Sequence, residues 1–303
     1  ASLEELASSA QAAIIAAPTT AHAALAIQLM EAGLDVLVEK PIAASVKEAE
    51  AMVSQARRRG RVLQVGHLER FNPAVDAARE LLTTPLFFEI HRLSLFSPRS
   101  LDVDVVSDLM IHDLDILLSL AAAEPREVRA AGIQVLSGKV DIANVRLAFP
   151  GGCIANLTAS RVSTERVRKL RFFQPGQYVS VDYARQECFS ISVAADKQIV
   201  PRAVAVAKQE PLKRQLAAFV ECVAARQRPR VDGEAALRAL SAVLGVASVP
   251  LAYALGRVTG GRGLGAAVAA PGQARRLIRC RPCTGCGGPR RGGRSPSRSC
   301  GWR

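Results

Sequence analysis

The stretch Ala12-Ala-Ile-Ile-Ala-Ala-Pro18 is a short run of apolar residues that ends at a proline. A short run with no polar alternation is typical of a strand that is buried on both faces, as in a parallel sheet. Thr19 and Thr20 can cap a helix that follows at residues 21–32, and Gly33 has the position of a C-cap glycine. This stretch therefore predicts the first strand and helix of an α/β unit.

The same pattern repeats immediately downstream. Residues 34–38 (Leu-Asp-Val-Leu-Val) and 61–65 (Arg-Val-Leu-Gln-Val) are two further apolar runs, and between them Ser45 begins a helix that stops at Gly60. Strands and helices that alternate at this spacing form right-handed βαβ units. We therefore expect a parallel sheet over the first 66 residues.

Beyond residue 66 the pattern changes to short strand-like stretches that are separated by glycine-containing turns, up to about residue 200. Such stretches predict an antiparallel sheet. The other elements are expected at residues 73–83 (helix), 86–95 (strand), 104–121 (helix), 211–226 (helix) and 233–247 (helix). The predicted fold class is thus α/β followed by α+β, with an open and mainly antiparallel sheet in the second part.

The net charge of +13 belongs almost entirely to the C-terminal segment. Residues 256–303 contain eleven Arg but no Lys, Asp or Glu, so the preceding 255 residues carry only about +2. The same segment holds twelve Gly and four Pro, a composition that predicts a disordered tail without a packed core. A nucleic-acid-binding arm is the rival interpretation of these arginines, but the nearly neutral remainder makes nucleic acid an unlikely partner.

The composition also bears on compartment and metal content. No run of 18 uncharged apolar residues and no signal peptide is present, which favours a cytoplasmic protein without a membrane span. Three cysteines are scattered singly, as is usual in a reducing compartment. The other four could suggest a zinc or iron–sulfur site, but we expect incidental cysteines and no metal; they are Cys280, Cys283, Cys286 and Cys300.

The tripeptide Glu39-Lys40-Pro41 follows the second predicted strand. Ligands of open α/β sheets bind at the carboxyl ends of the strands, so Lys40 is placed where a substrate or cofactor would lie. A lone lysine at a strand end is more often only solvated. The tripeptide at this location favours a functional role.

A second candidate group is carried by the helix expected at 104–121. Asp108 and His112 are four residues apart and share one helix face, and Asp115 lies close to that face. A histidine between carboxylates can be held in one tautomer and act as an acid or base. Acidic residues that favour the helix dipole, or a divalent-metal site, are the alternative interpretations.

Two further segments carry polar residues at element junctions. Arg70, within the stretch 66–73, could pair with an acid or with a phosphate, and we favour a supporting role. His22 follows Pro18 and Thr19 where a strand leads into a helix N-terminus, a natural place for a polar ligand. It could equally cap or pack.

Taken in their order along the chain, these four stretches resemble the Gfo/Idh/MocA family of oxidoreductases over roughly residues 1–250. The resemblance implies a Rossmann-type domain that binds NAD or NADP, joined to a domain whose open sheet often forms dimer contacts. A homo-oligomer is therefore expected. Lys40 would hydrogen-bond the reacting hydroxyl, His112 would be the acid or base, and Asp108 would orient the substrate.

The resemblance also implies the ligand contacts. Four residues would lie along the nicotinamide together with Lys40: Pro18, Thr19, His22 and Glu39. The substrate would be a sugar or a nucleotide-sugar, with a UDP-N-acetylhexosamine as the first choice. Basic residues on or near the strands could meet its phosphates, and Arg166 and Arg70 are the expected contacts; the basic cluster comprises Arg161, Arg166, Arg168, Lys169 and Arg171.

Two departures from the family pattern shape the expected domains. The strand, G-x-G-x-x-G loop and helix that hold the pyrophosphate are missing, so we expect an upstream start and poor NADH binding by this chain. Residues 1–66 would be a partial dinucleotide-binding domain, 67–250 a substrate and dimerisation domain, and 251–303 the tail. A catalytically inactive relative, or a fragment with a basic nucleic-acid-binding tail, is the alternative.

Overall fold

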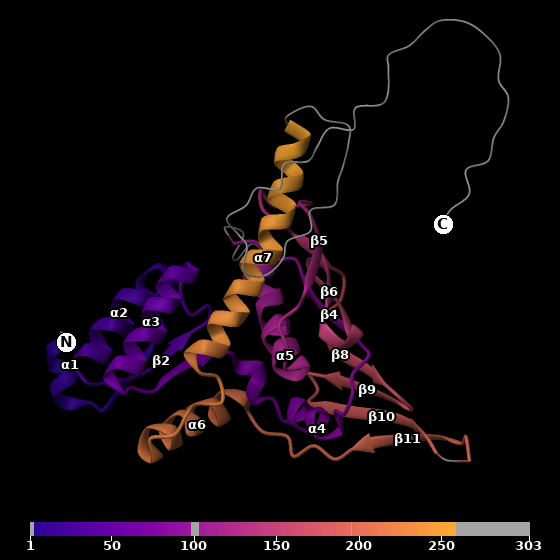
Figure 1. Cartoon of the computed structure of the whole chain (residues 1–303), viewed down its shortest axis with the longest axis horizontal. Helices are drawn as coiled ribbons and strands as arrows, with labels where there is room; N and C mark the ends of the chain where they lie inside the picture. Colours follow the sequence, from indigo (N-terminus) through magenta and orange to yellow (C-terminus); the bar gives the residue numbers. More distant parts are fainter. Residues whose placement is uncertain (1–2, 98–102, 195, 259–303) are drawn as a thin grey trace, which may run out of the picture.

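The computed structural model describes residues 3–97, 103–194 and 196–258 (Figure 1). Most of the expected tail, with its four cysteines, lies outside these residues. None of the helices in the described ranges is long and apolar enough to cross a membrane.

The first sheet has the predicted parallel strands, in the order β1 (Ala12–Ile15), β2 (Asp35–Glu39) and β3 (Leu63–Gly66). Its helices are α1 (Leu3–Ser9), α2 (Thr19–Glu31) and α3 (Val46–Arg59). Ser45 caps α3 in a full capping box with Glu48, as its hydroxyl accepts from the Glu48 N–H while the Glu48 carboxylate accepts from the Ser45 N–H. Gly60 ends the same helix at φ 57°, a left-handed conformation that glycine adopts without strain.

The second sheet has eight strands in the order β11-β10-β9-β8-β4-β7-β6-β5. Neighbours are antiparallel except β4 and β7, which run parallel. The strands are β4 (Phe87–Leu95), β5 (Glu127–Ile133), β6 (Ile142–Ala148), β7 (Ile154–Ser163), β8 (Val167–Gln174), β9 (Gln177–Asp182), β10 (Glu187–Val193) and β11 (Ile199–Val204). A short 3₁₀ turn, η3 (Pro150–Gly152), joins β6 to β7.

Helices cover one face of this sheet and leave the other open (Figure 1). The covering helices are α4 (Pro73–Leu81), α5 (Ile111–Ala121) and α7 (Gly233–Val258). Their apolar side chains form one core with the inward residues of the strands, such as Phe88, Ile90 and Phe172. The mainly antiparallel open sheet predicted from the sequence is confirmed.

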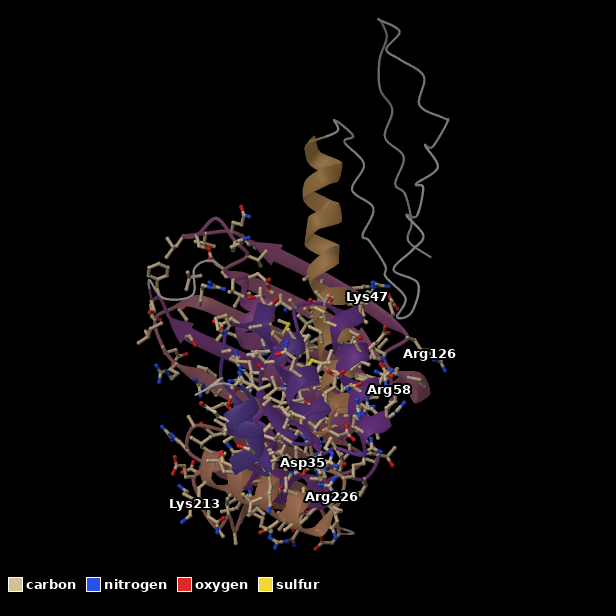
Figure 2. The ribbon with its side chains drawn as sticks, turned by 90° about the vertical axis from the view of Figure 1, so that its left-hand side faces the viewer. Asp35, Lys47, Arg58, Arg126, Lys213 and Arg226 are labelled. Carbon is tan, nitrogen blue, oxygen red and sulfur yellow. The ribbon has the colours of Figure 1, made fainter. Side chains whose placement is uncertain are left out.

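The C-terminal helices pack against the first sheet. The expected division into residues 1–66 and 67–250 does not predict this contact. Phe219 of α6 (Pro211–Ala225) packs on Leu37 and Val62. Arg226, at the end of α6, pairs with Asp35 at 2.5 Å (Figure 2). The start of α7 also enters the first core, and the helix then continues against α5 and β5. It ends at Val258 rather than 247 and so crosses the expected boundary at 250.

The helix predicted at 104–121 is two elements. A π-helical turn, η2 (Val106–Met110), precedes α5. The Asp104 carboxylate accepts hydrogen bonds from the N–H groups of Val106 and Ser107, both at 2.9 Å, and so begins this turn. Residue spacing alone gives no signal for the wider π-helical winding.

Candidate functional site

The carboxyl ends of β1, β2 and β3 meet η2 and α5 of the second part of the molecule, and Lys40 lies at this junction. Its ammonium group donates to the backbone carbonyl of Asp108 at 3.0 Å and lies 3.4 Å from the Asp108 carboxylate. The structure therefore brings together two of the three predicted catalytic residues, which are 68 positions apart in the sequence.

His112, the third predicted residue, lies on the first turn of α5. Its Nδ1 is buried and has no hydrogen-bond partner within the described part of the chain. Burial lowers the pKa of His112 well below its usual 6.5, and the nearby positive charges of Arg92 and Lys40 act in the same direction. A neutral imidazole in this place can accept a proton.

Glu39 lies at the same edge of the sheet, where it is paired in register with Gly66 of β3. Its carboxylate packs directly on the Gly66 backbone, because a Cβ there would lie only 2.9 Å from Oε2. The Lys40 N–H donates to the same oxygen at 3.3 Å. Gly66 is thus required for the close approach of Glu39.

His22 is buried and holds two loops together. Its Nδ1 lies 2.9 Å from the carbonyl of Pro41 and its Nε2 lies 2.8 Å from that of Ala17. Both ring nitrogens therefore have protein partners, and the cofactor contact expected of His22 stays a prediction. Pro18 is the N-cap residue of α2 and Thr19 is its first residue, so both directly follow Ala17 in the chain.

Arg70 pairs with an acid, one of its two predicted partners. It is only 8% exposed, its Nη1 lies 3.4 Å from Asp115 Oδ1, and its Nη2 donates to the carbonyl of Arg230 at 3.3 Å. Both terminal nitrogens thus have protein partners. The contact of Arg70 with the substrate stays a prediction.

Side chains alternate between the two faces of β8, so the members of the predicted basic cluster do not all lie on one face of the sheet. Lys169 and Arg171 are on the open face of the sheet, opposite His91 and Glu89 of β4. Arg168 is on the helix-covered face and contributes to the positive charge near His112. The exposed Arg166 lies in the turn before β8 and raises the positive charge around Arg168. Arg161 contacts Asp141 and the carbonyl of Val103.

Arg92 is a buried part of the site that the sequence interpretation missed. It is 3% exposed on β4 and binds Asp113 of α5 with two hydrogen bonds of 2.8 and 2.9 Å. It also lies 3.4 Å from Glu69. A charged residue at an inward position of an alternating strand was the available signal. The pair fixes α5, and hence His112, against the sheet.

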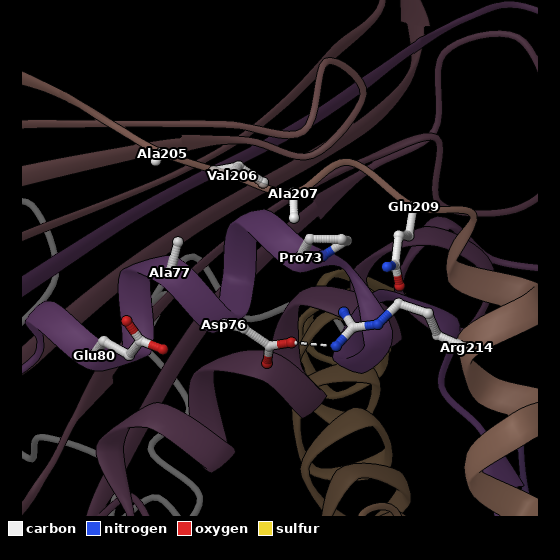
Figure 3. A pocket seen from close by; sticks show the side chains of 9 residues that line it. All are labelled: Pro73, Asp76, Ala77, Glu80, Ala205, Val206, Ala207, Gln209 and Arg214. Carbon is white, nitrogen blue, oxygen red and sulfur yellow. Dashed lines mark hydrogen bonds and ion pairs between the residues drawn. The ribbon is translucent and has the colours of Figure 1, made fainter.

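Two surface hollows lie outside this junction. One, of about 240 Å³, lies between α4 and the segment before α6, beside the ion pair of Asp76 and Arg214 (Figure 3). The other, of about 430 Å³, borders Asp115 and Arg70. Neither is lined by Lys40, Asp108 or His112. Within the described ranges, no group of three His, Cys, Asp or Glu residues is placed to hold a metal ion.

Comparison with known proteins gives two family matches. Residues 1–67 match the oxidoreductase family with an NAD-binding Rossmann fold, and residues 94–174 match the GFO/IDH/MocA C-terminal domain.

Individual relatives agree with these matches. UDP-N-acetylglucosamine 3-dehydrogenase of Acidithiobacillus ferrooxidans is 38% identical over 251 residues, which are 81% of this chain and 80% of the relative. A solved structure of that enzyme superposes with a TM-score of 0.79 at 37% identity and covers 83% of this chain and 82% of its own. The scyllo-inositol 2-dehydrogenase (NAD(+)) of Bacillus subtilis is 30% identical over 50% of this chain and 49% of its own.

Proposed function

The chain belongs to the Gfo/Idh/MocA family of NAD-binding oxidoreductases, and from this membership we propose that it oxidises a ring hydroxyl of a UDP-linked N-acetylhexosamine. The observation that carries the proposal is the contact of Lys40 with Asp108 beside a half-buried, neutral His112. A relative with the name UDP-N-acetylglucosamine 3-dehydrogenase supports this choice of substrate.

The chemistry follows from the three side chains. The Lys40 ammonium would donate a hydrogen bond to the hydroxyl oxygen of the substrate and stabilise the negative charge that develops there. His112, uncharged at neutral pH, would accept the hydroxyl proton. Asp108 would hold Lys40 in place and orient the sugar ring.

The same edge fits the nicotinamide end of NAD or NADP. Pro18, Thr19 and Glu39 lie at the carboxyl ends of β1 and β2, where an open α/β sheet binds its ligands. The cofactor would supply the hydride acceptor, and the protein would supply position and charge.

The phosphates of the nucleotide would meet the positive charge of Arg166 and Arg168. Arg166 is exposed in the turn between β7 and β8, and Arg168 is on the face of β8 that is turned toward His112. Arginine is well suited to phosphate because its planar group donates paired hydrogen bonds.

The test is substrate-dependent formation of NADH or NADPH with UDP-N-acetylglucosamine, with inositol and free N-acetylglucosamine as competing substrates. Lys40→Met should lower kcat by about 10³-fold, within the usual range for a proton-handling side chain. Lys47→Met is the matched control, because it removes the same charge from an exposed position on α3 (Figure 2). Equal rates for Lys40→Met and wild type would contradict the proposal. An inactive wild type would fit either the poor NADH binding expected of this chain or the non-catalytic relative, and titration with NADH separates the two.

We also propose that the open face of the eight-stranded sheet binds a second copy of this chain. The face carries a row of aromatic rings, with centroids 5.8 Å apart for Phe87 and Phe173 and 5.1 Å apart for Phe173 and Tyr178. Phe189 and Val193 of β10 extend the same face and are 39% and 54% exposed. An apolar face of this kind is typical of a homodimer interface.

A further inference from the structure

His67 is a buried histidine to which the proposed reaction assigns no role. It follows β3, is 1% exposed, and neither ring nitrogen has a hydrogen-bond partner within the described residues. The charges of Asp115, Arg70, Lys40 and Glu39 all act on its ring. It also contributes to the field at His112. His67 is thus close enough to Lys40, His112 and Asp115 to interact electrostatically with all three.

Asp115 continues the line of polar groups along α5. It is three residues beyond His112, and its Oδ2 lies 3.9 Å from Nδ1 of His67. That oxygen is buried without a hydrogen-bond partner in the described structure, and so is Nε of Arg70. At 3.9 Å the two atoms lie within ion-pair distance but beyond hydrogen-bond distance.

The hollow of about 430 Å³ is lined in part by Asp115 and Arg70. Ser119, one turn further along α5, also lines it. Two surface residues, Glu124 and Arg238, lie 3.9 Å apart at its rim and have half or more of their side chains exposed. Polar groups therefore extend from His112 through His67 and Asp115 to a hollow on the surface.

We propose that His67 and Asp115 form a proton-release route from His112 to this hollow. The proposal rests on the proposed function. Oxidation of a hydroxyl to a ketone breaks the carbinol C–H bond, whose hydride passes to the nicotinamide, and the O–H bond, whose proton passes to His112. His112 must lose that proton before the next turnover, while substrate and cofactor cover its other side. His67 and Asp115 act through His112 and do not touch the substrate.

Stopped-flow mixing of wild type with NAD⁺ and UDP-N-acetylglucosamine should show NADH absorbance and proton release to an indicator dye rising together. In His67→Gln, the first NADH should form at the wild-type rate, while proton release and steady turnover slow by about 10-fold, a smaller loss than for a direct acid or base. Asp76→Asn is the control, because it weakens the partly exposed ion pairs of Asp76 with Arg230 and Arg214, which lie outside the route. Proton release that keeps the wild-type rate in His67→Gln would overturn the proposal.

A second measurement needs neither cofactor nor turnover. In ¹⁵N-histidine NMR spectra of the ligand-free protein, Asp115→Asn should move the imidazole signals of both His67 and His112. His91, on the open face of the sheet, should stay unchanged as the internal control. Unmoved His112 signals would overturn the route. Coupled signals in a protein that forms no NADH would instead contradict only the proposed function.

Discussion

At the scale of single residues, the proposed reaction depends on contacts between side chains that lie far apart in the sequence. Lys40 was identifiable because it ends a strand, and Asp108 because it precedes His112 by four residues. Their 3.0 Å contact depends on the packing of two parts of the chain, which spacing cannot show. The environment of His112 was equally hidden, since Arg92 and Arg168 come from strands 20 to 56 positions away in the sequence.

The lowered pKa of His112 predicts the pH dependence of the reaction. Oxidation needs the neutral imidazole, and four positive or titratable groups oppose its protonation together with burial: Arg92, Lys40, His67 and Arg168. The acid limb of kcat/KM should therefore lie well below pH 6.5, with activity unchanged between that pH and neutrality.

The pH profile is measured for wild type and for His112→Gln, in which the limb should disappear along with most of the activity. An acid limb centred at or above pH 6.5 in wild type would contradict the prediction. The same shift has a consequence for folding. As the pH falls, His112 binds a proton at a higher pH in the unfolded chain than in the folded chain. This histidine therefore makes the protein less stable as pH falls below about 6.5.

At the scale of elements, the sequence predicted regular strands and helices better than irregular ones. The three parallel strands and α3 were predictable because apolar runs, Ser45 and Gly60 mark their ends locally. The π-helical turn η2 was not, because its geometry depends on Asp104 rather than on apolar spacing. The turn nevertheless decides where Asp108 meets Lys40.

Replacement of Asp104 should therefore impair the reaction without touching substrate. Asp104→Ala removes the acceptor of two backbone N–H groups and should cost about 1 kcal/mol, as for other cap residues. The turn would then relax, and kcat should fall about 10-fold through the displacement of Asp108.

The measurements are kcat and circular dichroism at a temperature where the variant is fully folded. Asp104→Asn keeps a side-chain acceptor and should recover most of the activity. Ser107→Ala should be nearly neutral, since it removes only the hydroxyl contact to Asp104 and keeps both backbone bonds. A folded Asp104→Ala with wild-type kcat would show that the turn does not position Asp108.

At the scale of the whole molecule, one helix belongs to both cores. The start of α7 packs Ala236 and Leu240 into the first core, and Val243 and Val246 enter the second. Gly233 allows the start of α7 to pack closely on the first core, because a Cβ at this position would lie 2.7 Å from Leu63. Amphipathic spacing predicted the helix but could not assign its two partners, since both cores present apolar side chains. The shared helix joins Lys40 and His112 into one site.

The last prediction concerns assembly through the open face of the eight-stranded sheet. If it binds a second copy, Phe189→Asp would place a carboxylate in the interface, where an unpaired charge is strongly unfavourable. Val220→Asp is the matched control, because Val220 is 65% exposed on α6, away from the sheet. Light scattering after gel filtration should give a dimeric mass or a multiple of it for wild type and Val220→Asp, and a smaller mass for Phe189→Asp. A monomeric wild type, or a Phe189→Asp variant of unchanged mass, would show that the aromatic row does not form the interface between copies.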